Sequence, residues 1–143
     1  MTPAPLARLI LLAALATATL PHARADTMTL APCPSSPNCV SSVASRDTQR
    51  VAPLRFTGDA AAAQARLVLA LQQMRGATIT EQRPGWISAE FRSRLLRFVD
   101  DVHLQLDARA SVFHVRSASR VGYSDLGVNR RRVEDLRRRF EDG

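Results

Sequence analysis

The sequence predicts an α+β domain in which a four-stranded antiparallel sheet, made of two hairpins, carries two helices on one face. Apolar residues first recur every three or four positions, four segments then alternate apolar with polar residues, and helical spacing returns near the C-terminus. One sheet face is apolar and meets both helices, while the other faces water or a partner. A disulfide-pinned irregular arm precedes this domain.

Residues 1–25 are typical of a secretory signal peptide. Arg8 supplies the positive start, an apolar run extends from Leu9 to Leu20, and Ala25 ends a small-x-small cleavage site. The run is shorter than the ~20 residues that a membrane-spanning helix needs. We therefore expect cleavage near Ala25 and a periplasmic or secreted product without a transmembrane segment; an uncleaved anchor is the alternative.

Residues 26–53 are rich in proline and serine and show no periodicity, which predicts an irregular arm ahead of an α+β domain at 54–143. Cys33 and Cys39 bracket five residues of this arm. In an exported protein such a pair is typical of a structural disulfide. A redox pair is the alternative, although redox pairs usually have Cys-x-x-Cys spacing.

The first helix is predicted over about 59–75, because its apolar residues form one helical stripe. Thr57 or Asp59 is suited to cap its start, and Gly76 lies where a left-handed C-terminal cap belongs. The last helix is predicted from Val133, Leu136 and Phe140, with Asp125 or Asn129 as its cap.

The four strands are predicted to pair as hairpins, the first with a three-residue loop at 83–85 and the second with a loop at 107–110. Matching the apolar faces gives these expected pairs: Ile79 with Ala89, Leu104 with Phe113, and His103 with His114. Trp86 and Glu90 then lie on the polar outer face.

Composition excludes several kinds of chemistry. All 20 basic residues are arginine, so lysine Schiff bases, phosphate-loop nucleotide hydrolysis and Ser-x-x-Lys acyl transfer are ruled out. Two cysteines are too few for a four-cysteine zinc or iron–sulfur site. The formal charge of +7 becomes +5 when the leader is removed. We expect no cofactor and no nucleic-acid partner, while a small anion, an anionic lipid or an envelope polymer remains a possible partner.

The segment 116–132 predicts an anion-binding site, because it runs from a strand through a glycine-containing loop into a helix. Three consecutive arginines, 130–132, oppose the helix dipole there and require a negative partner. The expected ligand-binding residues are Arg116, Ser117, Ser119, Arg120, Ser124, Asp125, Asn129 and Arg130. Alternatively the arginines form ordinary ion pairs along the helix, namely Arg130–Glu134, Arg131–Asp135, Arg137–Glu141 and Arg138–Asp142.

Asp100 and Asp101 are expected to have structural roles. Asp100 shares the inward strand face with Val102 and Leu104, and an inward carboxylate needs an arginine or hydrogen-bond donors. Arg130 or a backbone loop is the expected partner.

Two further kinds of site are alternatives to anion binding. His103 and His114 would hold a metal if a carboxylate joined them, but solvated histidines are the simpler interpretation. A hydrolase built on Ser117, Ser119 or Ser124, with His114 and Asp125, lacks a nucleophile-elbow pattern. The sequence therefore favours a non-enzymatic anion-binding module, with the hydrolase and a purely structural or interaction protein as alternatives.

Three segments, Cys33-Pro-Ser-Ser-Pro-Asn-Cys-Val-Ser-Ser42, Phe98-Val-Asp-Asp101 and Arg116-Ser-Ala-Ser-Arg-Val-Gly-Tyr-Ser-Asp-Leu-Gly-Val-Asn-Arg130, carry a resemblance to a known family. Together they resemble the bacterial family called domain of unknown function 1499, over nearly the whole chain after the leader. The resemblance implies that the cysteine loop, the aspartate pair and the Arg/Ser/Gly segment form a shared apparatus. It assigns no activity.

Overall fold

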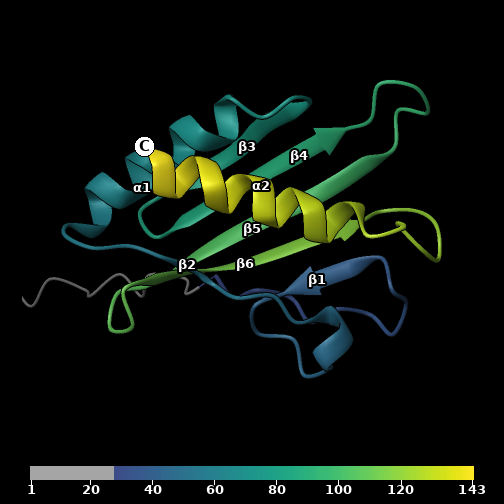
Figure 1. Cartoon of the computed structure of the whole chain (residues 1–143), viewed down its shortest axis with the longest axis horizontal. Coiled ribbons are helices and arrows are strands. Elements are labelled where there is room, and N and C mark those ends of the chain that lie inside the picture. Colours follow the sequence, from purple (N-terminus) through teal and green to yellow (C-terminus); the bar gives the residue numbers. More distant parts are fainter. Residues whose placement is uncertain (1–27) are drawn as a thin grey trace, which may run out of the picture.

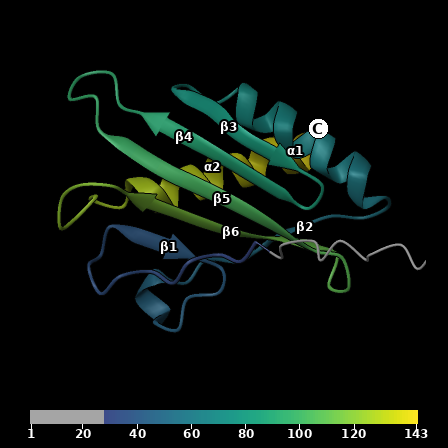
Figure 2. The same ribbon diagram turned by 180° about the vertical axis from the view of Figure 1, so that it is seen from behind.

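The computed structural model describes residues 28–143 (Figure 1). The predicted leader, residues 1–25, and its cleavage site lie outside the described residues. The predicted α+β class is confirmed, since two helices accompany an antiparallel sheet. Figures 1 and 2, drawn from opposite sides, show both helices on one face of the sheet. Within residues 28–143, neither helix has the length and hydropathy needed to cross a membrane.

The elements follow one another along the chain as β1 (Cys39–Ser41), η1, a 3-10 helix (Asp47–Gln49), β2 (Leu54–Arg55), α1 (Ala60–Gln72), β3 (Ala77–Arg83), β4 (Trp86–Arg92), β5 (Val99–Asp107), β6 (Val112–Ser119) and α2 (Val128–Asp142). In the sheet the strand order is β1-β6-β5-β4-β3, and β2 also pairs with β6.

The sheet has six strands, so the predicted count of four is wrong. The additional strands β1 and β2, of three and two residues, both pair with β6. Strands this short contain too few residues for an alternating pattern to be recognised. The predicted irregular arm at 26–53 therefore contributes a strand to the sheet. The predicted disulfide between Cys33 and Cys39 is confirmed, and it joins the start of β1 to the preceding loop.

Helix α1 begins where the sequence predicts. The Asp59 carboxylate accepts a hydrogen bond of 2.8 Å from the N–H of Ala62 and so caps the helix. The helix ends at Gln72, and Gly76 follows with a φ of +80°. A Cβ atom at Gly76 would lie 2.6 Å from the carbonyl oxygen of Arg92, so glycine is required by both the backbone angle and the space.

The first hairpin has the predicted register, with Ile79 opposite Ala89. Its turn has two residues rather than three, because Arg83 pairs directly with Trp86. Trp86 is buried rather than lying on an open polar face. Its ring stacks on His103, with centroids 5.6 Å apart, and its Nε1 donates to Ser88.

The predicted register of the second hairpin is wrong by two residues. The observed pairs are Leu104–Val115 and His103–Arg116, in place of Leu104–Phe113 and His103–His114. The turn occupies 108–111, one residue later than predicted, because Asp107 accepts hydrogen bonds from two backbone N–H groups of the turn, those of Arg109 (3.0 Å) and Ala110 (3.1 Å). Matching the apolar faces alone permits the strand register to shift by two residues, so the position of the turn decides which register forms.

The core lies between the inner sheet face and the two helices. Val133, Leu136 and Phe140 of α2 are buried against it, and Phe113 of β6 packs edge-on to Phe140 with ring centroids 6.4 Å apart. Burying such side chains stabilises the fold by about 1.5–3 kcal/mol each. This packing places the first turns of α2 at the end of the sheet where both β4 and β6 have their C-terminal ends (Figure 1).

Candidate functional site

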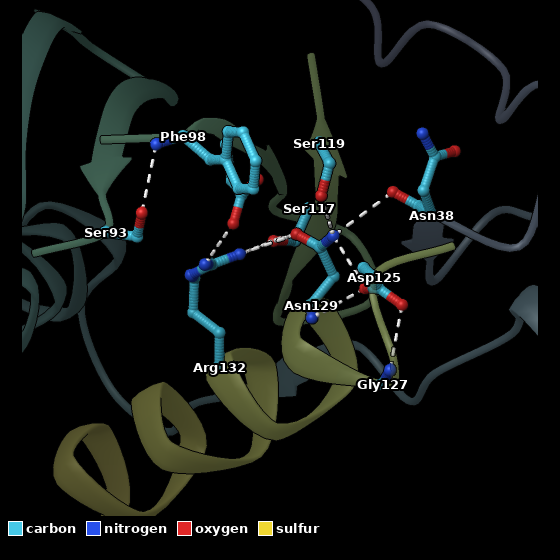
Figure 3. Close-up of polar contacts among 10 residues, drawn as sticks. Asn38, Ser93, Phe98, Ser117, Ser119, Asp125, Gly127, Asn129 and Arg132 are labelled. Carbon is cyan, nitrogen blue, oxygen red and sulfur yellow. Dashed lines mark hydrogen bonds and ion pairs between the residues drawn. The ribbon is translucent and has the colours of Figure 1, made fainter. Parts of the chain in front are cut away.

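Asn129, in the first turn of α2, is fully buried and lies at the centre of a polar network (Figure 3). Its Oδ1 accepts hydrogen bonds from Ser117 Oγ at 2.6 Å and from Arg132 Nη1 at 2.5 Å. Its amide Nδ2 donates toward three acceptors: Asp125 Oδ2 at 2.7 Å, Ser119 Oγ at 2.9 Å and the carbonyl oxygen of Asn38 at 3.1 Å. The network therefore joins β6, α2 and the segment just before β1.

Asp125 holds the start of α2. Its carboxylate accepts hydrogen bonds from the N–H groups of Gly127 at 2.9 Å and Asn129 at 2.8 Å. The N-cap residue itself is Gly127, so neither predicted residue occupies that position, although Asp125 bonds to the first turn from two residues before it. Gly127 has a φ of +80°, an angle that favours glycine. Burial raises the pKa of Asp125, but hydrogen bonds from Asn129 and Gly127 outweigh it, and the pKa lies below its ordinary value.

Asp100 forms an ion pair with Arg132, not with the predicted Arg130. Both side chains are nearly buried, 12% and 10% exposed, and the Arg132 guanidinium lies 4.8 Å from the centroid of the Phe91 ring. The reason is helical geometry: Arg132 lies three residues after Asn129 and so shares the face that meets the sheet. Arg130 points elsewhere and donates to the carbonyl oxygens of Thr48 and Arg50, at 2.8 and 2.9 Å.

Asp101, on the opposite face of β5, pairs with Arg120 at 2.7 Å. The same guanidinium contacts Glu90 at 2.5 Å. These two hydrogen-bonded carboxylates raise the pKa of Arg120 above its ordinary value. The adjacent aspartates therefore anchor opposite faces of the sheet.

The eight predicted ligand-binding residues do not form one pocket. Ser117, Ser119, Asp125 and Asn129 converge in the buried network. The three arginines are dispersed: Arg116 and Arg120 lie on the outer sheet face, and Arg130 contacts the segment 48–50. Ser124 is exposed in the loop before α2, where it lines a hollow together with Ser119 and Asp125.

Arg116 lies between His103 and Ser41 on the outer face. Burial lowers its pKa, although Asp101 partly opposes this, and its buried Nε has no hydrogen-bond partner in the described part of the chain. Burial, followed by the charge of Arg116, lowers the pKa of His103. We expect His103 to stay neutral near pH 7 for this reason.

The alternative metal site required His103 and His114 to pair across the two strands. That pairing does not form, because His103 lies opposite Arg116 rather than His114. Among residues 28–143, no group of three or more histidine, cysteine, aspartate or glutamate side chains is arranged to hold a metal.

The triad of the alternative hydrolase interpretation is not assembled in the described residues. His114 points to the outer face, whereas Ser117 contacts Asn129 on the inner face. His114 instead has Ser42 Oγ at 3.1 Å from Nδ1 and Asp107 at 3.8 Å from Nε2. Ser42 Oγ also accepts the N–H of Val115 at 2.9 Å, and the Asp107 distance is too long for a hydrogen bond. This arrangement therefore fixes a strand edge rather than activating a nucleophile.

A groove of about 510 Å³ lies between the end of α1, the end of β4 and the exposed side of α2. Six arginines and two aspartates line it: Arg75, Arg92, Arg131, Arg132, Arg138 and Arg139, with Asp100 and Asp135. Asp100 is engaged by Arg132, while Asp135 accepts from both Arg138 and Arg139 at 3.1 Å. Arg75 has no ion pair or side-chain hydrogen bond within residues 28–143. The groove therefore has a marked surplus of positive charge.

An apolar hollow of about 430 Å³ adjoins the groove. Phe98, Val121 and Leu126 line it together with serine and aspartate side chains, and the two hollows share Ser93, Asp100 and Val128. One side of the site is thus strongly basic and the other largely apolar, which suits an amphiphilic anion.

Sequence reasoning missed Arg75, Arg92, Arg138 and Arg139 as site residues, because the groove joins segments that are far apart in the chain. The signal in the sequence that could have indicated the groove was the excess of arginine over acidic residues in α2. The ion pairs expected along this helix also differ: the observed pairs are Arg137–Glu134, Arg138–Asp135 and Arg139–Asp135. Two arginines share one aspartate, so the helix does not neutralise its own charge.

Two comparisons with known proteins bear on this site. The sequence model of the family described as "Protein of unknown function (DUF1499)" matches residues 29–140. That range includes the buried network and both hollows. A search of curated proteins found no match to the chain.

Proposed function

Since the chain belongs to the DUF1499 family of proteins of unknown function, we propose from the geometry that it is a non-enzymatic module that binds an anionic group in the arginine groove. The group is a phosphate, a carboxylate or a lipid headgroup. We further propose that the protein is exported to the cell envelope, which the leader-like segment and the disulfide support.

The observation that carries the proposal is the charge imbalance of the groove, whose lining holds six arginines and two aspartates; of these arginines, Arg92 also pairs with Glu90, outside the lining, at 3.8 Å. Like charges held this close repel one another, and a bound anion relieves the repulsion. Guanidinium groups are suited to the task because their planar forks donate two parallel hydrogen bonds to phosphate or carboxylate oxygens.

Residues of the predicted segment 116–132 hold the groove arginines in position. Asn129 and Asp100 fix Arg132 in the groove floor, and Asp125 fixes the start of the helix that carries Arg131, Arg138 and Arg139. A rigid helix holds these guanidinium groups in place before a ligand arrives, which reduces the entropy lost on binding.

Binding is favoured over catalysis by the composition of the lining. Of the described residues that line the groove, none is a histidine, and Ser93 uses its hydroxyl to accept the N–H of Phe98 at 2.9 Å. The lining therefore supplies positive charge and donors rather than a nucleophile with its base.

Inorganic phosphate is expected to raise the melting temperature of the wild-type protein, at constant ionic strength set with chloride. A ligand at 100 times its Kd stabilises a protein by about 2.7 kcal/mol. The double variant Arg75→Gln/Arg138→Gln should lose at least about tenfold in affinity, because each charge-assisted hydrogen bond contributes about 1.5–3 kcal/mol. Both side chains are exposed, so the fold should persist.

Arg109→Gln is the matched control, because Arg109 is an exposed arginine in the β5–β6 turn, at the other end of the sheet. It removes one positive charge and should keep the wild-type response. The proposed function would be contradicted if phosphate raised the melting temperature of the double variant as much as that of the wild type. It would also be contradicted if phosphate, acetate and glycerol phosphate all left the melting temperature of the wild type unchanged. Either result would favour a purely structural role.

A further inference from the structure

Exposed apolar side chains are concentrated at one end of the molecule. Seven of the nine large apolar residues that are exposed in residues 28–143 lie at 95–128, between the end of β4 and the start of α2. Leu95, Leu126 and Tyr123 are the most open, at 90%, 84% and 76% exposure. Exposed apolar residues that gather in one patch mark an interaction surface, unlike single scattered ones.

Two neighbouring loops carry six of these seven residues, 93–98 between β4 and β5 and 120–127 between β6 and α2; the seventh, Val128, begins α2. The N–H of Arg120 donates to the carbonyl oxygen of Val99 at 3.1 Å, and side chains of both loops line the apolar hollow. Figures 1 and 2 show both loops extending beyond the same end of the sheet. We call residues 93–98 and 120–127 together the loop tip.

The loop tip has a defined backbone shape. Ser93 and Phe98 close the first loop with two hydrogen bonds of 2.9 Å. Arg97 and Leu126 have φ angles of 54° and 53°, a left-handed conformation that costs free energy for residues other than glycine. In Leu126 this conformation holds an apolar side chain in solvent, where burial against a partner would be favourable.

The charge on the loop tip is positive. Arg94 and Arg97 flank the two leucines, and neither has an ion pair within the described range 28–143. Arg92 and Arg131 lie beside them in the arginine groove. Asp125, the acidic residue within the loop tip, already accepts two backbone N–H groups through its carboxylate. Exposed apolar side chains that are flanked in the sequence by unpaired arginines complement a surface that is apolar within and negatively charged outside.

We propose that the loop tip docks on an anionic lipid bilayer. Leu95, Leu96 and Leu126 enter the boundary between headgroups and acyl chains, Arg94 and Arg97 lie at the level of the phosphates, and the arginine groove receives one headgroup. Apolar side chains buried to this depth and basic residues near the surface both strengthen membrane binding. The insertion into the bilayer is inferred from the loop tip alone. Only the binding of a headgroup in the groove rests on the proposed function.

Cosedimentation with lipid vesicles tests the docking. All forms are produced by export, so that they share one N-terminus. Wild-type protein should bind vesicles of equal parts phosphatidylglycerol and phosphatidylcholine, and bind pure phosphatidylcholine far more weakly. Leu95→Gln/Leu96→Gln should lose about 100-fold, as two buried leucines each contribute about tenfold. Arg94→Gln/Arg97→Gln should lose about 25-fold, since each basic residue near the surface contributes about fivefold.

Matched controls come from elsewhere on the surface. Leu69→Gln removes an exposed leucine of α1, and Arg109→Gln removes an exposed arginine of the β5–β6 turn. Both should bind anionic vesicles as the wild type does. Equal vesicle binding by the wild type and the Leu95→Gln/Leu96→Gln variant would overturn the docking surface.

The melting-temperature response to inorganic phosphate separates the two proposals. The loop-tip variants should keep the wild-type phosphate response, because they leave the groove arginines in place. A phosphate response without any vesicle binding overturns the docking, points to a protein partner for the loop tip and leaves the proposed function standing. Vesicle binding that depends on the leucines, without a response to any soluble anion, upholds the docking and overturns the proposed function.

Discussion

Replacing Asn129 with alanine is expected to lower the free energy of unfolding by about 3–5 kcal/mol, because the variant leaves several buried polar groups without partners. Ser117 loses the acceptor of its hydroxyl, and Arg132 loses one of its acceptors. The carbonyl of Asn38 loses a donor, so the link between α2 and the segment before β1 is broken as well. Urea unfolding followed by circular dichroism measures the loss.

Arg131→Ala is the control, since Arg131 lies in the same turn of α2 but is exposed. Its cost should stay within about 0.5 kcal/mol, as for most surface substitutions. An Asn129→Ala variant less than about 1 kcal/mol below the wild type would show that the network does not hold the helix start.

Replacing Arg132 with methionine is expected to cost about 3–5 kcal/mol, because it leaves the nearly buried carboxylate of Asp100 without a counter-charge. The loss should be recovered in large part by Asp100→Leu/Arg132→Met, since replacing both partners of a buried ion pair by apolar residues is often neutral. Phe91 offers an apolar contact for the new methionine. A double-mutant cycle in urea measures the coupling.

Arg120→Met is the matched control on the other side of the sheet. Its ion pair with Asp101, the residue next to Asp100, is open to solvent, and exposed pairs contribute little. Losses of similar size for Arg132→Met and Arg120→Met would contradict the distinction between the two aspartates, as would a double variant no more stable than Arg132→Met.

Local patterns were sufficient for much of the fold. The apolar stripe and cap of α1 are properties of adjacent residues, and Asp59 caps the helix as predicted. The pairing of Ile79 with Ala89 follows from alternation and one short turn. The inward position of Asp100 likewise follows from strand parity, because Val102 and Leu104, two and four residues later in β5, face the same side.

Other features depend on contacts between distant segments. Strand β1 exists because β6 offers it an edge, and its three residues have no pattern of their own. The choice of Arg132 over Arg130 as the partner of Asp100 depends on how α2 is rotated against the sheet, which Leu136 and Phe140 decide by packing. The arginine groove joins the end of α1, the end of β4 and α2, so no single segment of sequence displays it.

The central claim is that the surplus charge of the groove binds an anion at that place. The most direct test is a titration with inorganic phosphate, at constant ionic strength, that follows the side-chain Nε–H signals of arginine in ¹H–¹⁵N spectra. The signals of Arg75, Arg138 and Arg139 are expected to shift together with one saturable curve, while those of Arg109 and Arg120 stay in place. Shifts of equal size in all five, or none in the three groove arginines, would contradict the account.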